Sequence, residues 1–330
     1  MKDKTKKVSV IVKEKNMKND HQSKTFSYSE SFYKIYGLNV RSQLPLQGAA
    51  LATEGEAAVR IACGKVPDFL KKAGELGYGT WTNGFTSAWF RVRDGTQIYV
   101  EGGRHITVEP AFLPDMTLVS SLLLSAGMAL ICLQRGEPFL HGSALVVRGQ
   151  AILLCGESGA GKSTVATQLL QQGAGLLADD TVRIHGESEM VAEPSYPQQK
   201  LCRDVALRCG QDLEELRYID EERDKYAWLR TDCYVEKAQI LKKIFLLRKS
   251  AVGSGQTEAV RVRELTGQEA LEVVSAQLYL SDTYRHITGI PLPLMEQLIR
   301  ITAQTQILEV TRQEQGDTVQ EVVTKILQFC

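Results

Sequence analysis

A glycine-rich loop near the middle of the chain carries the residues with the clearest chemistry. Its nine residues read Gly-Glu-Ser-Gly-Ala-Gly-Lys-Ser-Thr and fill every fixed position of the phosphate-loop pattern G-x-x-x-x-G-K-[ST]. In that pattern Lys162 reaches the β- and γ-phosphates of a nucleotide, and the Ser163 hydroxyl binds Mg²⁺. We therefore expect ATP or another nucleoside triphosphate, together with Mg²⁺, to be bound by Gly156, Glu157, Ser158, Gly159, Ala160, Gly161, Lys162, Ser163 and Thr164.

Two adjacent acids, Asp179 and Asp180, end a short apolar run that follows the loop and its expected helix. Phosphate-loop enzymes hold Mg²⁺ at an acid in this position, directly or through water. We predict that Asp179 joins Ser163 as a metal ligand, and that one of the two acids accepts the proton of an attacking hydroxyl group. The alternative is that both acids only fill turn and cap positions, where Asp is common.

A histidine is expected beside the loop from the register of a hairpin. If residues 148–150 form the turn between two strands, His141 lies opposite Glu157, and a turn at residues 149–150 moves it opposite Ser158. A histidine near a nucleotide can titrate or form hydrogen bonds close to neutral pH, so His141 is a candidate catalytic residue. A structural histidine at the end of a strand is the alternative.

Basic residues downstream are candidates for contact with the acceptor or with the transferred phosphate. Lys200 and Arg203 rank first because they follow a loop bracketed by Pro194 and Pro197, while Lys225 and Arg230 rank lower. Each of them can equally be a solvated surface charge, as most lysines and arginines are.

Strands and helices alternate in the part of the chain that must position these residues. Apolar runs predict strands at residues 143–147, 151–155, 176–179, 182–185, 244–247 and 307–310. Helices are predicted at residues 162–172, 267–278, 292–305 and 318–329. Strands mixed with helices around a phosphate loop predict an α/β domain, which we place at residues 113–330.

The preceding residues have a different pattern. Residues 28–112 predict a small β-rich domain with one helix near residues 67–76, a hairpin turning at Asp94-Gly95, and a strand at residues 105–109. Residues 32–40 are expected to form a single strand. Residues 1–27 are rich in lysine and poor in aromatic residues, so we expect a disordered arm.

Composition excludes several classes of function. The formal net charge is +0, which gives no general attraction to nucleic acid or to an anionic membrane. Seven cysteines without C-x-x-C spacing favour reduced thiols in a cytoplasmic protein, and the charged N-terminus does not look like a signal peptide.

Residues 116–133 are uncharged over 18 positions, close to the minimum for a membrane span. A buried helix is the preferred interpretation.

Three segments together resemble the HPr kinase/phosphorylase superfamily, whose fold is related to that of phosphoenolpyruvate carboxykinase. They are Leu-His-Gly-Ser at residues 140–143, the phosphate loop, and Leu-Leu-Ala-Asp-Asp at residues 176–180. Residues 32–45 are similar to the opening segment of divergent relatives, and residues 193–201 are similar to their P-x-Y-P-x-x-K-L segment. The resemblance spans most of residues 32–310. It implies that His141, Asp179, Asp180 and Lys162 serve phosphoryl transfer to a serine hydroxyl.

The sequence also departs from the bifunctional members of that superfamily. Glu157 stands where they have Asp, Thr164 stands where they have an acid, and their E-I-R-G-x-G signature has no counterpart. The chain looks more like kinases that phosphorylate a serine of a lasso peptide precursor. The resemblance thus implies an ATP-dependent peptide serine kinase. From the composition we expect it in the cytoplasm, with no nucleic acid or membrane partner, and homo-oligomerisation stays open.

Three other functions would also use such a phosphate loop. An HPr-directed regulatory kinase/phosphorylase and a non-catalytic nucleotide-gated binding module stay open as alternatives. A transport ATPase is disfavoured, because that class needs a signature near L-S-G-G-Q and a later strand ending in Asp-Glu. The nearest sequence here, Leu-Thr-Gly-Gln at residues 265–268, is a poor match and no such strand follows it.

Overall fold

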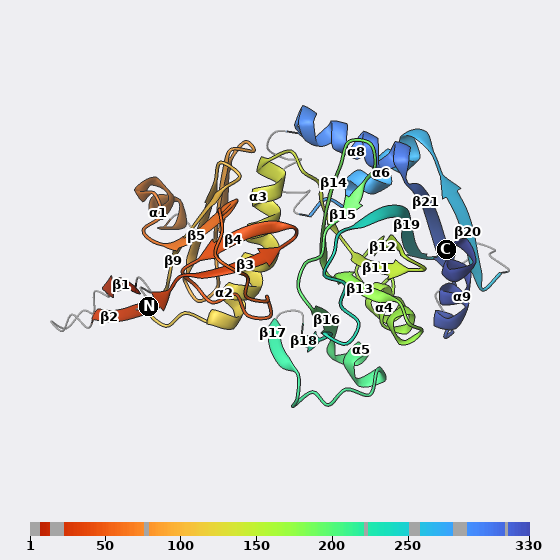
Figure 1. Ribbon diagram of the computed structural model, residues 1–330, viewed down its shortest axis with the longest axis horizontal. Coiled ribbons are helices and arrows are strands. Elements are labelled where there is room, and N and C mark those ends of the chain that lie inside the picture. The colour runs from red at the N-terminus through yellow and green to blue at the C-terminus, as the bar shows by residue number, and fades with distance from the viewer. Residues whose placement is uncertain are drawn as a thin grey trace. The chain divides into compact units, whose positions relative to one another are not determined.

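The computed structural model of the chain describes residues 7–13, 23–75, 79–220, 224–250, 258–279, 289–313 and 316–330. The fold is mixed α/β with several sheets, and the chain divides into an N-terminal unit that ends at Arg135 and a C-terminal unit that begins at Gly136 (Figure 1). The two units are described separately below.

The N-terminal unit is built on a seven-stranded sheet in the order β3-β4-β5-β9-β8-β7-β6. The strands are β3 (Ser31–Ile35), β4 (Leu38–Ser42), β5 (Val59–Cys63), β6 (Thr80–Asn83), β7 (Ser87–Arg91), β8 (Gln97–Glu101) and β9 (His105–Glu109). The helix predicted near residues 67–76 is confirmed as α1 (Asp68–Glu75), and the strand predicted at residues 105–109 is confirmed as β9.

One local expectation for this unit was wrong, and a second was confirmed only in part. Residues 32–40 form the hairpin β3–β4 rather than one strand, because Tyr36 and Gly37 both take positive φ values, 52° and 72°, as a tight two-residue hairpin turn requires. The β7–β8 hairpin exists, but its loop covers residues 92–96 and is longer than an Asp-Gly turn. The Asp94 carboxylate accepts a hydrogen bond from the Thr96 N–H at 2.8 Å and holds that wider loop.

The lysine-rich arm also differs from the expectation of disorder. Strands β1 (Lys7–Lys13) and β2 (Ser23–Ser29) pair antiparallel within it, with Lys13 opposite Ser23. Residues 1–6 and 14–22 of the arm lie outside the described residues.

A continuous helical stretch, Met116–Gln134, closes the N-terminal unit. It consists of α2 (Met116–Leu122), the π-helical turn η1 (Leu123–Gly127) and α3 (Met128–Gln134). Among the described residues, this stretch is long and apolar enough to span a membrane, and 72% of its apolar 18-residue segment is buried inside the fold. That burial agrees with the preferred interpretation of the apolar run as a core helix.

Side chains at the end of α3 attach it to the sheet of the same unit. Gln134 accepts a hydrogen bond from the Gly103 N–H at 2.7 Å, and Arg135 donates to the carbonyl oxygens of Gly103 and Ala58 at 2.6 and 2.8 Å. The helix therefore belongs to the N-terminal unit, whereas the sequence-based boundary at residues 112–113 assigned it to the second domain.

The C-terminal unit contains a nine-stranded sheet whose centre is parallel. Strand β12 (Gln150–Gly156) pairs parallel with β19 (Gln239–Lys249), which pairs parallel with β21 (Gln306–Arg312). The remaining strands are β10 (Phe139–His141), β11 (Ser143–Val147), β13 (Gly175–Ala178), β14 (Thr181–His185), β15 (Val191–Ala192) and β20 (Val260–Leu265). All six predicted strands are confirmed, while β10, β15 and β20 were not predicted.

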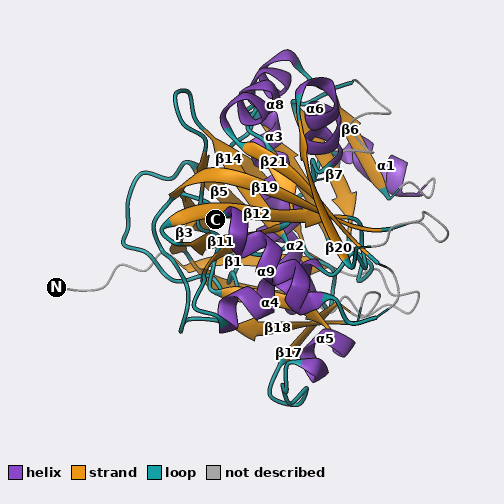
Figure 2. Cartoon of the chain, turned by 90° about the vertical axis from the view of Figure 1, so that its right-hand side faces the viewer, coloured by secondary structure: helices purple, strands orange, loops and turns teal. Residues whose placement is uncertain are grey.

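Helices cover the sheet, as buried strand residues on both faces require. Helices α4 (Lys162–Gln171) and α9 (Val319–Phe329) pack on one face, where Leu154, Phe245 and Leu308 form part of a buried cluster with them. Helices α6 (Gly267–Ala276) and α8 (Leu292–Gln304) pack on each other and lie away from α4 and α9 in both views (Figures 1 and 2). The four predicted helices are confirmed to within two residues.

A smaller, three-stranded sheet was not predicted. Its order is β16-β18-β17, with β16 (Gln198–Cys202), β17 (Arg217–Asp220) and β18 (Lys225–Leu229), and α5 (Arg203–Arg208) packs against it. This sheet positions two of the lysines discussed below.

Candidate functional site

The phosphate loop has the context that the sequence predicts. Strand β12 ends at Gly156, helix α4 begins at Lys162, and residues 157–159 are exposed at the tip between them. Gly156, Gly159 and Gly161 have φ values of 135°, 79° and 104°, which side-chain-bearing residues rarely adopt. Backbone N–H groups at the start of α4 and the positive end of its dipole suit the binding of a phosphate.

Two of these glycines make a matched test of the loop. A Cβ atom at Gly156 would lie 2.3 Å from the Leu247 carbonyl oxygen, whereas a Cβ atom at Gly159 would meet nothing within 4 Å. Backbone strain alone costs about 1–3 kcal/mol at either position. Overlap with β19 adds about 1–3 kcal/mol for Gly156→Ala only.

Because the strain cost is common to both variants, we expect Gly156→Ala to lower the free energy of unfolding by about 1–3 kcal/mol more than Gly159→Ala. Urea denaturation of both variants, followed by circular dichroism, measures this difference. Equal losses of stability would show that Gly156 is not held against the neighbouring strand.

Lys162 lies against the backbone of its own loop. Its Nζ donates to the carbonyl oxygens of Gly156 at 2.7 Å and Glu157 at 3.0 Å. Burial lowers the pKa of the Lys162 ammonium group. The loop is held from outside by Gln277, whose Oε1 accepts from the Gly156 N–H at 3.2 Å, and by Arg312, whose Nε donates to the Ala160 carbonyl at 3.3 Å.

His141 lies at the end of β10, and the register expected for it was wrong. The turn between β11 and β12 is formed by residues 148–149, so Ser143 pairs with Leu154 and the strand pairing stops there. Gly142 passes so close to β12 that a Cβ atom would be 2.5 Å from the Leu154 carbonyl oxygen. The chain then leaves β12, and His141 pairs with Thr181 of β14 instead of facing Glu157 or Ser158.

The new position still connects His141 to both the acids and the loop. Its Nδ1 lies 2.8 Å from the Asp180 carbonyl oxygen, and its backbone N–H donates to the Gln277 carbonyl at 2.7 Å. Because a carbonyl oxygen can only accept, Nδ1 carries the hydrogen and Nε2 of the neutral ring is left as an acceptor. Burial lowers the pKa of His141, which favours this neutral form.

Asp179 is buried, with 4% of its surface exposed, and both carboxylate oxygens accept hydrogen bonds. The Ser143 hydroxyl donates to Oδ1 at 2.5 Å, and the Lys200 backbone N–H donates to Oδ2 at 2.7 Å. Burial raises the pKa of this carboxyl group, and the two hydrogen bonds offset part of that effect. None of the ion pairs among the described residues involves Asp179, in contrast to its neighbour.

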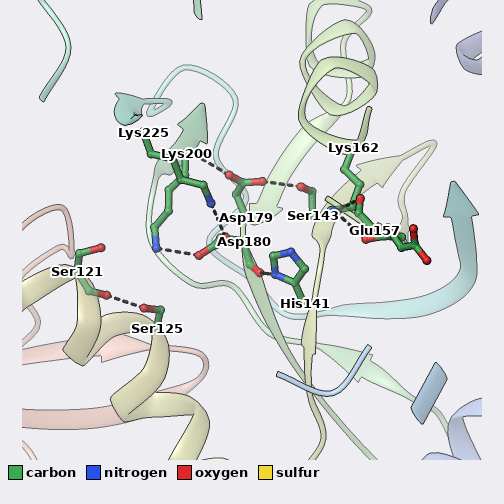
Figure 3. A network of polar contacts seen from close by, with 11 residues as sticks. Ser121, Ser125, His141, Ser143, Glu157, Lys162, Asp179, Asp180, Lys200 and Lys225 are labelled. Carbon is green, nitrogen blue, oxygen red and sulfur yellow. Dashed lines mark hydrogen bonds and ion pairs between the residues drawn. The ribbon is translucent and has the colours of Figure 1, made fainter. Parts of the chain in front are cut away.

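Asp180 is held between two lysines. Its Oδ2 lies 2.9 Å from Lys200 Nζ and its Oδ1 lies 3.3 Å from Lys225 Nζ (Figure 3). Burial alone would raise the pKa of Asp180, but the two ammonium groups outweigh burial and hold it well below its usual range. Burial would likewise lower the pKa of Lys200, and the Asp180 charge instead raises it well above its usual range. Asp180 itself has a φ of 69°, so its backbone turns sharply where strand β13 ends.

The donor set suits Mg²⁺, which prefers oxygen ligands and is usually bound by one or two carboxylates together with substrate phosphates. The Asp179 carboxylate is buried without a cation partner among the described residues, and a buried charge favours such a partner. Ser163 supplies a hydroxyl at the start of α4. Among the described residues no group of three or more His, Cys, Asp or Glu side chains could hold a metal by itself. Phosphate oxygens would therefore complete the coordination shell.

The four basic candidates separate clearly in the structure. Lys200 and Lys225 reach the acid pair. Arg203 instead forms a two-point ion pair with Asp224, at 2.6 and 3.1 Å, on the outside of the three-stranded sheet. Arg230 is buried, lies 4.2 Å from the centre of the Trp228 ring and donates to Gln199 at 3.0 Å, which is a structural role.

Sequence reasoning missed two residues of the site. Ser143 was seen only as a strand residue, although it stands in the Leu-His-Gly-Ser segment next to the histidine. Gln277 carries no motif and lies over 100 positions from the loop, so no sequence signal points to it. Its backbone and side chain together bridge His141 and Gly156.

Comparison with known proteins gives a family for the central part of the chain. Residues 136–202 match the family model described as HPr Serine kinase C-terminal domain. The HPr kinase/phosphorylase of Pelodictyon phaeoclathratiforme is 51% identical over 49 residues, and that of Nitrosomonas europaea is 49% identical over 79 residues. The matched segment contains His141, the phosphate loop, the acid pair and Lys200.

These matches cover only part of each protein. The match to the Pelodictyon relative covers 15% of this chain and 15% of that protein. The match to the Nitrosomonas relative covers 24% of each. The solved structure of the Hpr(Ser) kinase/phosphatase from Coxiella burnetii aligns with 58% of this chain and with 89% of the Coxiella chain. The sequence identity is 13% and the TM-score is 0.30, a likeness too weak to define the fold.

Proposed function

Because this chain belongs, through residues 136–202, to the HPr kinase superfamily, we propose that it is an ATP-dependent serine kinase of the phosphate-loop type. The single observation that carries the proposal is the convergence of Lys162, His141 and the Asp179-Asp180 pair on one site (Figure 3). A non-catalytic nucleotide-binding module would need the loop, but it would have no use for a buried acid pair joined to a neutral histidine.

The proposed reaction is an in-line transfer. The serine oxygen forms a bond to the γ-phosphorus, the bond from that phosphorus to the bridging oxygen of ADP breaks, and the hydroxyl proton passes to a carboxylate. Lys162 and the loop N–H groups neutralise charge on the β- and γ-phosphates. Mg²⁺, held by Ser163 and Asp179, would neutralise further charge on the same phosphates.

Asp180 is the better candidate for the proton acceptor. Asp179 is engaged through both oxygens by Ser143 and the Lys200 N–H, so it is better suited to hold Mg²⁺. Asp180 is ionised at neutral pH because the two lysines lower its pKa. The Nε2 atom of neutral His141 can accept a hydrogen bond and orient the attacking hydroxyl group.

Two acceptors are proposed. A serine of a lasso peptide precursor follows from the loop residues Glu157 and Thr164 and from the resemblance of residues 32–45 and 193–201 to divergent relatives. HPr is the second candidate, and it is favoured by the name HPr kinase/phosphorylase that the relatives carry. Incubation with ATP and each acceptor, followed by mass spectrometry for phosphoserine, separates the two. Incubation of the phosphorylated product with free phosphate tests reversal.

Lys162→Met tests the nucleotide half of the proposal. We expect phosphoserine formation to fall by about 10²–10³-fold, because a charge that stabilises the transferring phosphoryl group is removed. Lys325→Met, which changes an exposed lysine on α9, serves as the control and should keep wild-type activity. If the wild-type protein binds ATP but phosphorylates neither acceptor, kinase activity toward both is excluded and the binding-module alternative gains support.

A further inference from the structure

The two lysines that hold Asp180 differ in how firmly they are fixed. Both come from the three-stranded sheet, where Lys200 is opposite Ala227 and Lys225 is opposite Cys202, so their side chains share one face of it. Lys200 is enclosed, with 6% of its side chain exposed, and lies 2.9 Å from Asp180. Lys225 is more accessible, with 17% of its side chain exposed, and its contact is longer at 3.3 Å.

Lys200 is also fixed through its backbone. Its N–H donates to Asp179 while its ammonium group donates to Asp180, so one residue holds both acids at once. Lys225 contacts the acid pair only through its long side chain, from the first residue of β18. Of the two ammonium groups, that of Lys225 can therefore change partner without moving a strand.

Lys225 and the loop lysine approach the acid pair from opposite sides (Figure 3). Their charges act on each other: burial is the main cause of the lowered pKa of Lys162, and the positive charge of Lys225 contributes to it. A transferring phosphoryl group carries its negative charge on three equatorial oxygens, so it suits a space with ammonium groups on both sides.

We propose that Lys225 is a substrate-contacting residue that exchanges Asp180 for the transferring phosphoryl group. Its ammonium group leaves Asp180 Oδ1 and donates to an equatorial phosphoryl oxygen, and Oδ1 becomes free to accept a hydrogen bond from the serine hydroxyl. Lys200 stays on Oδ2 throughout and keeps the carboxylate in place. This inference rests on the proposed kinase function and adds to it a second phosphoryl-binding cation, which no phosphate-loop motif contains.

The test uses a mimic of the transferring phosphoryl group and needs no acceptor. Calorimetry compares the binding of Mg²⁺–ADP alone with Mg²⁺–ADP plus tetrafluoroaluminate, in the full-length wild-type protein, Lys225→Met and Lys225→Arg. A charge-assisted hydrogen bond is worth about 10–100-fold in affinity. We expect Lys225→Met to keep the ADP affinity within about twofold and to weaken the tetrafluoroaluminate complex about 10–100-fold. Lys225→Arg should restore most of the loss.

Lys237→Met, at an exposed lysine beyond β18, is the matched control and should bind both ligands as the wild type does. The inference is overturned if Lys225→Met binds tetrafluoroaluminate as tightly as the wild type, or if ADP affinity falls by the same factor. It is also overturned if wild-type protein binds ADP but gains nothing from tetrafluoroaluminate. Failure of the wild type to bind ADP at all would instead refute the proposed function.

Discussion

Replacement of Asp180 by asparagine is expected to lower serine phosphorylation by about 10²–10⁴-fold, because the amide cannot accept the hydroxyl proton. ATP binding should persist, since the Lys162 contacts to Gly156 and Glu157 do not involve Asp180. Phosphoserine formation under single-turnover conditions measures the loss, and calorimetry with a non-hydrolysable ATP analogue measures nucleotide binding. The variant keeps the size of the side chain, but its amide has a single acceptor oxygen, so it can keep the hydrogen bond from only one of the two lysines.

Asp179→Asn is the matched comparison at the adjacent position. We expect this variant also to lose phosphorylation, but to recover part of it as Mg²⁺ concentration is raised, because Asp179 is the proposed metal ligand. Asp180→Asn should not respond to added Mg²⁺. If both variants phosphorylate the acceptor at the wild-type rate, neither acid takes part in the reaction. If Asp180→Asn recovers with added Mg²⁺ and Asp179→Asn does not, the two roles are reversed.

Lys200→Met is expected to lower the free energy of unfolding of the C-terminal unit by about 3–5 kcal/mol, toward the lower end of that range because Lys225 still pairs with Asp180. The reason is that removal of one partner leaves a buried charge without its closest counter-ion. Thermal denaturation should show a transition lower by roughly 6 °C or more. Arg203→Gln, which breaks the exposed pair with Asp224 just after the same strand, should leave the transition temperature almost unchanged, because exposed ion pairs contribute little to stability.

A double variant separates the charge effect from lost packing. Asp180→Asn combined with Lys200→Met removes both buried charges, so its loss of stability should be smaller than the sum of the two single losses by about 0.5–3 kcal/mol. Additive losses would mean that the Lys200 side chain stabilises the unit by packing alone. In that case the ion pair between the two side chains would contribute little.

Much of the C-terminal unit could be predicted from its sequence, because its signals are local. The phosphate loop, the strand before it and the helix after it are consecutive in the chain, and their periodicity and glycines are sufficient to define them. The same holds for the apolar strands and helices that follow. The family resemblance rests on the same consecutive residues, and residues 136–202 match the HPr Serine kinase C-terminal domain model.

His141 illustrates where local reasoning ends. Counting back along a hairpin assumes that the two strands stay paired, and the close approach of Gly142 to Leu154 ends that pairing. The structure places the histidine beside the acid pair, where its Nδ1 faces the Asp180 carbonyl oxygen and not the loop. A register can be extrapolated only as far as the strand continues straight.

The sequence by itself determined which residue types are present for chemistry: a phosphate loop with Lys162 and Ser163, a histidine upstream, and two acids downstream. Only the tertiary structure decided how the two acids differ. Asp179 receives a hydroxyl and a backbone N–H, while Asp180 receives two ammonium groups, one of them from β18 some 45 positions away. Ionisation and proton transfer depend on such contacts between distant segments, and the three-stranded sheet that creates them has no signature in the sequence.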